Sequence, residues 1–170
     1  VIPTITKQGV LILSSQQIAP KPPLKSGLRT NVGGYDLKTG TLLWFFSIED
    51  QTLQKPATRE DVVYFADREL LALDANTGKV LWKRDLMGAT PRNVTFESQQ
   101  FGPVIGYDRL YALSREGVLF AFDFHGNKLW EKPMLEEDPP NTTSIQRTAS
   151  LAVGSQGHIY FHNRKELWGM

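Results

Sequence analysis

The chain has 170 residues, of which 41% are hydrophobic and 22% are charged, a composition typical of a globular domain with a sizeable core. Its 19 basic and 18 acidic side chains nearly cancel, so charge gives no reason to expect nucleic acid or an anionic membrane as a partner. The absence of cysteine excludes disulfides, thiolate metal sites and cysteine nucleophiles, and no apolar run reaches the roughly 18–20 residues of a membrane helix.

The strands expected along the chain fall into four units. In each unit a turn residue precedes a short β-rich run, and these turn residues are Gly9, Asp61, Asp108 and Gly157. Their spacing of 47 to 52 residues, with four short strands per unit, is typical of β-propellers. The expected strands are Val1–Thr6, Val10–Ser14, Asn31–Leu37, Thr41–Ser47, Lys55–Arg59, Val62–Ala66, Glu69–Asp74, Lys79–Arg84, Phe101–Gly106, Arg109–Ser114, Val118–Asp123, Asn127–Lys132, Ser150–Val153, His158–His162 and Glu166–Met170.

One hairpin sequence occurs three times, as Gly34–Trp44, Ala72–Trp82 and Ala121–Trp130. In each copy an aspartate opens a polar turn, a glycine lies within it and a tryptophan follows on the second strand. The glycine suits the positive φ that a tight antiparallel turn requires, and the aspartate is expected to hold the turn by side-chain to backbone hydrogen bonds. The fourth tryptophan, Trp168, falls on the third strand of its unit and is not expected to share the role of the other three.

This spacing, Ala-x-Asp-x-x-x-Gly-x-x-x-Trp, resembles the tryptophan-docking repeat of the quinoprotein, or PQQ-like, β-propeller family. The second copy matches fully, the first has Gly34 in place of alanine, and the third is one residue shorter. The resemblance implies that each tryptophan lies between neighbouring blades and stacks on a peptide plane of the adjacent motif. It also implies a location outside the cytoplasm, periplasmic or secreted/luminal. The implied docking residues are Trp44, Trp82, Trp130, Gly40, Gly78 and Gly126.

We therefore expect an all-β propeller segment of four-stranded antiparallel blades, with units at about 1–50, 51–87, 98–135 and 147–170. About three and a half blades are present, and the propeller is expected to be incomplete, because a propeller closes by pairing its first and last strands. The chain could be a fragment of a six- to eight-bladed propeller, which we favour. Another chain could instead supply strands, or Val1–Thr6 could close a four-bladed ring as its last strand.

Three long segments are expected to project from one face of the propeller, namely Ser15–Thr30, Asp85–Gln100 and Pro133–Gln146. Long loops at one end of a rigid scaffold are common binding sites, although solvated linkers are an equal alternative. The charged residues that we select for a partner face are Lys21, Lys25, Arg29, Arg92, Glu136 and Glu137. Asn93 and Asn141 each begin an N-glycosylation triplet, which matters only in a eukaryotic secretory protein.

No residue is assigned to catalysis, cofactor binding or metal binding. Enzymes of the resembled family hold PQQ and calcium on the propeller axis, and no residue set here matches those ligands. His158 and His162 would lie about 13 Å apart on a strand at roughly 3.3 Å per residue, too far for a shared metal ion. His125 falls in a turn, and Asp36, Asp74 and Asp123 are assigned to turn formation.

The sequence thus favours a non-catalytic module that binds a protein partner as a scaffold or sensor, through the face with the long loops. The alternative is a fragment of a PQQ-dependent dehydrogenase whose cofactor ligands lie outside these residues. In a third hypothesis, open blade edges pair with another chain.

Overall fold

The computed structural model describes residues 2–18, 28–49, 55–86, 102–114, 117–134, 149–154, 157–163 and 167–169, and in them it contains strands and turns only. The described strands are β1 (Ile2–Ile5), β2 (Val10–Ile18), β3 (Leu28–Asp36), β4 (Leu42–Glu49), β5 (Ala57–Arg59), β6 (Val62–Ala66), β7 (Glu69–Asp74), β8 (Val80–Asp85), β9 (Val104–Ile105), β10 (Leu110–Leu113), β11 (Val118–Phe122), β12 (Lys128–Pro133), β13 (Ala149–Val153), β14 (Ile159–Asn163) and β15 (Leu167–Gly169). The all-β prediction is confirmed.

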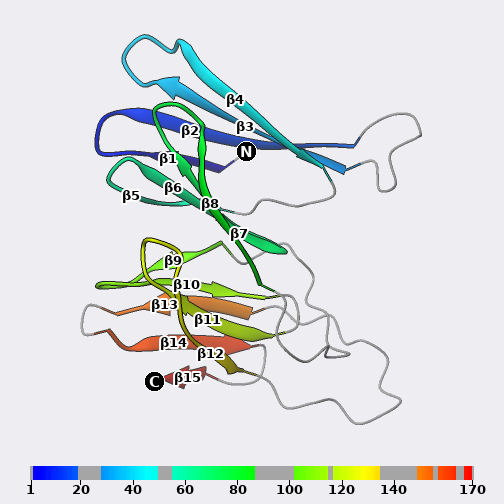
Figure 1. Cartoon of the computed structure of the whole chain (residues 1–170), viewed down its shortest axis with the longest axis vertical. Coiled ribbons are helices and arrows are strands. Elements are labelled where there is room, and N and C mark those ends of the chain that lie inside the picture. Colours follow the sequence, from blue (N-terminus) through cyan, green and yellow to red (C-terminus); the bar gives the residue numbers. More distant parts are fainter. Residues whose placement is uncertain are drawn as a thin grey trace.

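The strands form separate antiparallel sheets that follow chain order, which we call blade 1 (β1–β4), blade 2 (β5–β8), blade 3 (β9–β12) and blade 4 (β13–β15). Figure 1 shows these sheets in chain order from top to bottom, with blades 3 and 4 overlapping in this view. The first strand of each blade contacts the first strand of the next, so these strands lie innermost, whereas β4, β8 and β12 are outermost. The four-stranded propeller blade is therefore the repeating unit, as the spacing of turn residues predicts.

The core lies between blades rather than within one. Val63 and Phe65 of β6 pack with blade 1, whereas Tyr64 and Ala66, which alternate with them, pack with blade 3. A third buried cluster joins blade 3 to blade 4 through Tyr111 and other side chains. In blades 2 and 3 both faces are covered, and their middle strands β6, β7, β10 and β11 are apolar runs with no polar alternation in their interiors. No blade buries its own faces, so each depends on its neighbours for stability.

The strand bounds agree with expectation in blade 2 and differ most in blade 1. The β2–β3 ladder continues from Ser15↔Asn31 to Ile18↔Leu28, inside the segment that we expected to be an insertion from Ser15 to Thr30. That expectation was wrong at both ends, because ladder bonds are made by backbone groups, which polar residues also carry. Likewise, Asp85 and Pro133 close strands instead of opening loops.

The first strand settles one of the three closure hypotheses. β1 pairs with β2 from Ile2↔Ser14 to Ile5↔Leu11 and is therefore the innermost strand of blade 1. Closure of a four-bladed ring by Val1–Thr6 as the last strand of blade 4 is thus wrong. The physical reason is the short turn at Thr6–Gly9, where the Gly9 N–H donates to the Thr6 carbonyl and folds β1 directly back onto β2.

Two phenylalanines provide a test of burial between blades. Phe65 of β6 is fully buried between blades 1 and 2, whereas Phe45 of β4 is 60% exposed. Phe65→Ala should lower the free energy of unfolding by about 3–5 kcal/mol, because it leaves a cavity in a packed junction. Phe45→Ala should change it by no more than about 0.5 kcal/mol. Urea titration of both variants measures the difference, and equal losses would contradict packing between blades as the main stabilising term.

Candidate functional site: the blade junctions and the outer strands

The three aspartates that open the repeated turns each bind several donors of the same turn. Asp36 Oδ1 accepts from the Lys38 and Thr39 amides and from the Thr39 hydroxyl, at 2.8–3.0 Å. Asp74 Oδ1 accepts the equivalent hydrogen bonds from the Asn76 and Thr77 amides and from the Thr77 hydroxyl. In the shorter third turn, Asp123 accepts from the His125 amide and from the backbone and side chain of Asn127. These carboxylates are thus engaged within their turns.

Hydrogen bonding also changes two of these pKa values. The Thr39 backbone N–H, followed by its hydroxyl, lowers the pKa of Asp36, because both bonds favour the charged carboxylate. The Asn127 side chain, followed by its backbone N–H, lowers the pKa of Asp123. Burial opposes both shifts but is outweighed.

A β-bulge lies directly before each repeated tryptophan. In blade 2 the register runs from Ala72↔Trp82 to Leu73↔Val80, so Leu81 has no partner of its own. The same step leaves out Leu43 in blade 1 and Leu129 in blade 3. A bulge re-aims the side chains that follow it. Here it sets each tryptophan towards the next blade and leaves the preceding leucine on the outside, 46–48% exposed at all three sites.

Trp44 joins blade 1 to blade 2. Its indole N–H donates to the Ala75 carbonyl at 2.7 Å, and its ring lies on Gly78, where an added Cβ would be 2.6 Å from Cδ2. Gly78 has a φ of +71°, so this position requires glycine for two reasons, its backbone conformation and the close approach of the ring. On its own blade, Trp44 also covers Gly34, where an added Cβ would be 2.3 Å from the ring. Glycine at the first position of this copy therefore has a steric reason.

Trp82 joins blade 2 to blade 3 in the same way. Its indole N–H donates to the Phe124 carbonyl at 3.2 Å, and its ring lies on Gly126, which has a φ of +81°. Arg84, two residues further along β8, adds a hydrogen bond from Nε to the Gly126 carbonyl at 2.7 Å. Tyr64 lies against both Trp82 and Phe124, and burial raises its pKa. Both junctions thus combine a stacked ring with one indole hydrogen bond.

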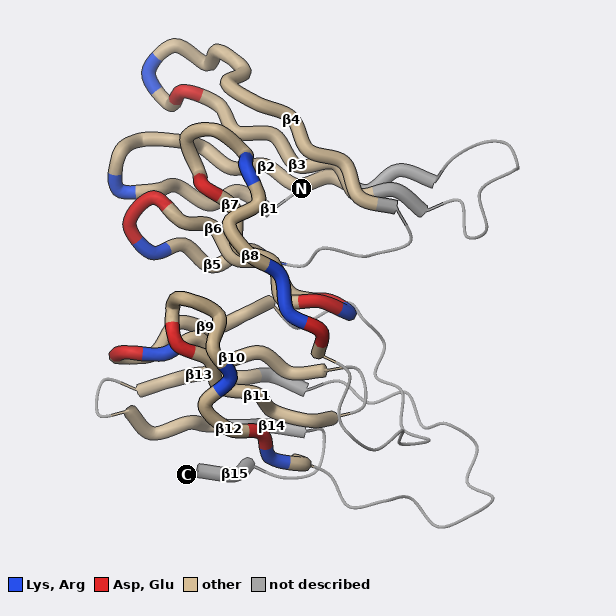
Figure 2. The backbone as a smooth tube through the Cα atoms, in the orientation of Figure 1, with Lys and Arg blue, Asp and Glu red and all other residues tan. Residues whose placement is uncertain are grey.

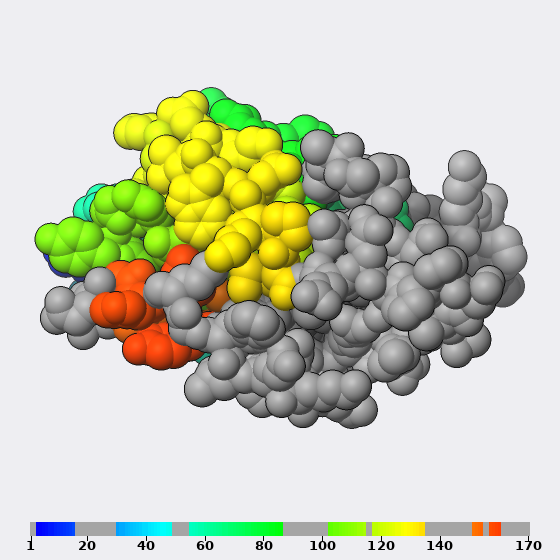
Figure 3. All heavy atoms as spheres, turned by 90° about the horizontal axis from the view of Figure 1, so that it is seen from below, coloured from blue at the N-terminus to red at the C-terminus, as the bar shows by residue number. Residues whose placement is uncertain are grey.

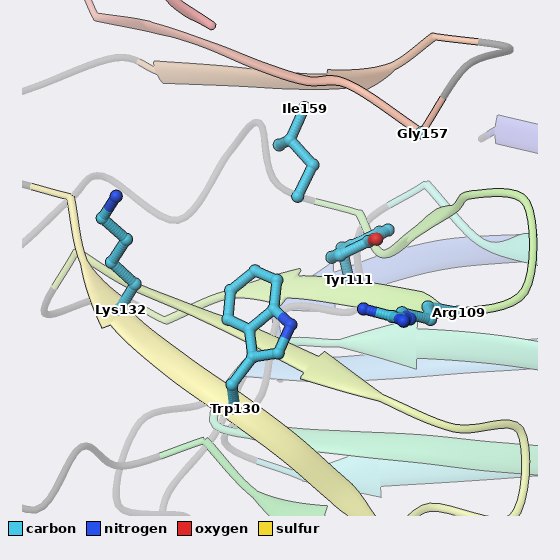
Figure 4. A pocket seen from close by; sticks show the side chains of 6 residues that line it. All are labelled: Arg109, Tyr111, Trp130, Lys132, Gly157 and Ile159. Carbon is cyan, nitrogen blue, oxygen red and sulfur yellow. The ribbon is translucent and has the colours of Figure 1, made fainter. Parts of the chain in front are cut away.

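Trp130 occupies the corresponding place at the junction of blades 3 and 4, but it borders a hollow. The hollow measures about 270 Å³ and is lined by Arg109, Tyr111, Trp130, Lys132, Gly157 and Ile159. Figure 4 shows the Trp130 ring projecting from β12 beside Tyr111, with Ile159 of blade 4 opposite. Among the described residues, none provides an acceptor for the Trp130 indole N–H or a glycine beneath its ring. Figure 3 shows the described residues of blade 4, in orange, lying against those of blade 3, in yellow.

The outer strands carry both charges and exposed apolar side chains. Figure 2 shows basic and acidic residues together in the short turns and along β8 and β12, while most inner strands are uncharged. Lys83 pairs with Glu69 and Lys128 pairs with Glu131, and in both pairs the lysine is exposed and the glutamate is partly buried. In blade 1, however, β4 exposes Leu42, Leu43 and Phe45 close together.

Most residues selected for a partner face lie outside the described part of the chain. These are Lys21, Lys25, Arg92, Glu136 and Glu137, together with Asn93 and Asn141 of the glycosylation triplets. Arg29 lies on β3, although its side chain is not described. Trp168 and His162 are placed on β15 and β14 by their backbones alone, and His125 and His158 are exposed.

Within the described ranges, no three histidine, aspartate or glutamate side chains gather as metal ligands. The same ranges hold no helix long and apolar enough to span a membrane.

Three features of the junctions were missed by sequence reasoning. They are the bulged leucines before each tryptophan, the apolar residue after each turn aspartate (Leu37, Ala75 and Phe124), and the basic residue two places after two of the tryptophans (Arg84 and Lys132). Each has a signal in the repeats, because aligning the three hairpins brings these residue types into register. Without coordinates, nothing distinguished them from ordinary strand residues.

Comparison with known proteins identifies the fold family. The family described as outer membrane protein assembly factor BamB matches residues 28–169. The chain belongs to this family of PQQ-like repeat propellers. No curated protein matches the chain in sequence.

Solved structures agree on the fold. BamB from Moraxella catarrhalis superposes with a TM-score of 0.69 and 16% identity over 98% of this chain and 47% of that chain. A quinohemoprotein alcohol dehydrogenase from Pseudomonas putida HK5 gives 0.64 and 16% over 94% of this chain and 27% of its own. The computationally designed Ika8 protein gives 0.61 and 12% over 99% and 45%. The chain thus spans less than half the length of each, and at these identities the likeness concerns the fold alone.

The contact between Trp44 and Gly78 can be tested with a matched glycine. Gly40 and Gly78 both have positive φ, but an added Cβ meets nothing within 4 Å at Gly40. Gly40→Ala should cost about 1–2 kcal/mol of stability from backbone strain alone. Gly78→Ala should cost a further ~1–3 kcal/mol because the methyl group overlaps the ring. Denaturant unfolding in the wild-type and Trp44→Ala backgrounds checks this, since the extra cost should disappear without the indole.

The turn aspartates predict a pH dependence of stability. The pKa values of Asp36 and Asp123 are lower in the folded protein than in the unfolded chain, where the pKa of aspartate is about 3.9. Their contribution is therefore fully present above that value and is lost as pH falls through the folded pKa values. Urea midpoints measured from pH 6 down to about pH 2.5 should fall less steeply for Asp36→Asn/Asp123→Asn than for the wild type. Parallel curves would show that these turns do not stabilise the charged form.

Proposed function

We propose that this chain forms part of a non-catalytic propeller scaffold that holds another protein during outer-membrane protein assembly. Support comes from the family match over residues 28–169, since that family is described as an assembly factor. The chain covers less than half of the BamB chain, so the role of that whole protein is carried over only as a proposal. A sensor role, which the sequence also allows, would use the same kind of protein-binding surface.

The observation that carries this proposal is the exposed apolar surface of the outer strand β4. Leu42, Leu43 and Phe45 are 50%, 46% and 60% exposed within four consecutive residues. Single exposed apolar residues are ordinary, whereas a cluster of large ones on an outer strand is typical of a surface that another protein covers. Phe45 is also an aromatic side chain, a type that is enriched at the cores of protein interfaces.

The proposed partner is therefore a protein with an apolar patch of its own, not nucleic acid. The face expected to carry the long connections, with Lys21, Lys25, Arg29, Arg92, Glu136 and Glu137, remains a second proposed contact region. The proposed compartment is extracytoplasmic, in keeping with the outer-membrane role in the family description.

A second candidate function is part of a PQQ-dependent dehydrogenase, with the cofactor ligands outside these residues. The observation that favours it is the likeness of fold to quinohemoprotein alcohol dehydrogenases, with TM-scores of 0.56 and 0.64. Under this hypothesis the cofactor ligands lie outside these residues, so we derive no chemical step from it. We rank this function second because the family that matches residues 28–169 is described as an assembly factor.

Site-specific photocrosslinking tests the scaffold function. A photoreactive amino acid replaces Phe45, and as a matched control it replaces Tyr107, which is 89% exposed in a turn of blade 3. In cells that make the protein, position 45 should give one discrete crosslinked protein, identified by mass spectrometry as a component of outer-membrane assembly. Position 107 should give none. Absence of a product at position 45, or the same products at both positions, would count against β4 as the contact surface.

Titration with PQQ and calcium separates the two functions. The scaffold function predicts no change in quinone absorbance and no dye reduction with alcohols when both are added to the purified full-length protein that contains this segment. Saturable binding of PQQ with alcohol-dependent dye reduction would instead support the dehydrogenase and overturn the scaffold proposal.

A further inference from the structure

We propose that the free edge of β4 binds an extended, uncharged segment of a partner protein, which adds one strand to the four strands of blade 1. This inference rests on the proposed function, because it specifies how the partner meets the exposed surface of β4. Among the described strands β4 pairs with β3 alone, so its other side presents free backbone groups. Strand addition to such an edge is a common mode of peptide recognition, since the edge itself supplies the hydrogen bonds.

The three outer strands differ in the charge that they carry. Aligned on their tryptophans, β8 reads Val-Leu-Trp-Lys-Arg-Asp and β12 reads Lys-Leu-Trp-Glu-Lys-Pro, whereas β4 reads Leu-Leu-Trp-Phe-Phe-Ser. Charged residues and proline on an edge strand oppose its pairing with another chain. From Leu42 to Ile48, β4 has neither, and Figure 2 shows the same contrast in colour. An edge of this composition is a hazard for aggregation unless another chain covers it.

The exposure of Phe45 follows from its position in the blade. The equivalent residue of blade 2 is Lys83, which pairs with Leu71, a member of the buried cluster between blades 1 and 2. Register partners lie on the same face of a sheet, so Lys83 is on the face that turns towards blade 1. Its side chain is nevertheless 65% exposed. A neighbouring blade leaves this position open, so Phe45 is available to a partner that approaches the outer edge.

Phe45 also lacks a side chain beside it on β3. Its register partner is Gly33, and the space over Gly33 is taken by the Tyr35 ring, which would lie 2.8 Å from an added Cβ. The other flank of Phe45 is the free edge. A large apolar residue of an added strand would pack there, because directly opposed Cβ atoms lie only about 4.5–5.5 Å apart. On the opposite face, Phe46 and Ile48 are partly buried, so the added strand would meet apolar side chains on both faces.

The bulge at Leu43 limits the length of the bound segment. From Trp44 to Glu49 the register of β4 against β3 is unbroken, and it shifts just before Trp44. The added strand therefore pairs along Trp44–Glu49 only. Opposite Trp44–Ile48 the segment is uncharged and rich in β-branched or aromatic residues, since a charge buried beside these side chains would have no partner.

A second copy of the chain is a weaker candidate for the occupant. Antiparallel pairing of the two regular stretches would set Glu49 of one copy against Trp44 of the other, and it would leave a bulge at each end. Neither feature stabilises the pairing. We therefore favour a separate protein that offers an extended segment.

Crosslinks mapped to single residues test strand addition. In cells that make the full-length protein containing this segment, a photoreactive amino acid replaces Phe45, Ser47 or Glu49 in turn, and Lys83 as the matched control on β8. The first three positions should give products with one segment of one partner, identified by mass spectrometry. Each step of two residues along β4 should move the contact by two residues along that segment, always in the same direction. Position 83 should give no product, because charges protect its strand.

A proline scan of the mapped partner segment gives a second readout. Proline should lower the yield of the crosslink at least about tenfold at alternate positions, where the lost N–H would bond to β4. At the positions between them, where the N–H points away from β4, the yield should stay near that of the unchanged segment. Alanine at the same positions controls for the loss of each side chain.

The outcomes separate this inference from the proposed function. Products at position 45 whose contacts are spread over several segments, or a uniform response to proline, would overturn strand addition and leave β4 as the scaffold contact. Absence of a product at every position of β4 would overturn the contact surface itself, and strand addition with it. A product formed with a second copy of the same protein would overturn the proposal in favour of self-pairing.

Discussion

The structure depends on one contact between neighbouring sheets, an indole ring laid on the peptide of a glycine turn. At this contact the Trp44 ring packs directly on the backbone of Gly78, which has no Cβ to keep the ring away. The indole N–H also satisfies a backbone carbonyl that the turn itself leaves free. Stacking supplies apolar burial, and the hydrogen bond fixes the orientation of the ring. At the two junctions that have it, this contact adds to the buried clusters that the inner and middle strands form between blades.

Because contacts of this kind run only between adjacent blades, cooperativity passes along the chain from neighbour to neighbour. Blade 2 shares buried clusters with the blades on both sides, through the two faces of β6 and β7. The described faces of blades 1 and 4 that point away from the core have no such cluster. Protection against hydrogen exchange should therefore be highest in the middle of the chain.

The sequence predicts the repeated parts of this fold well because they depend on local chemistry. Strands β6 and β7 begin and end as expected, since turn residues bound them on both sides. Gly40, Gly78 and Gly126 all have positive φ, which the turn spacing requires. The extension of β2 and β3 could not be predicted, because a ladder of backbone hydrogen bonds continues through polar residues that resemble a loop in sequence.

The candidate site was less accessible to sequence reasoning. The role of Phe124 depends on Trp82, 42 residues away, and the hollow at Trp130 depends on what surrounds the ring in space. Such features depend on contacts between residues that are far apart in the chain. A single sequence carries no local signal for these contacts. The exposed row on β4 was also missed, because its leucines and Phe45 have the same apolar character as core residues.

The bulges at Leu43, Leu81 and Leu129 also bear on solubility. An outermost strand presents unpaired amide and carbonyl groups along its free side, a hazard for stacking into fibres. The extra residue bends each of these strands at the same place and breaks the regular spacing of those groups. If two molecules paired along their outermost strands, the pairing would lose register after a few residues. The bulge that orients each indole towards the next blade therefore also prevents edge-to-edge polymerisation of the propeller.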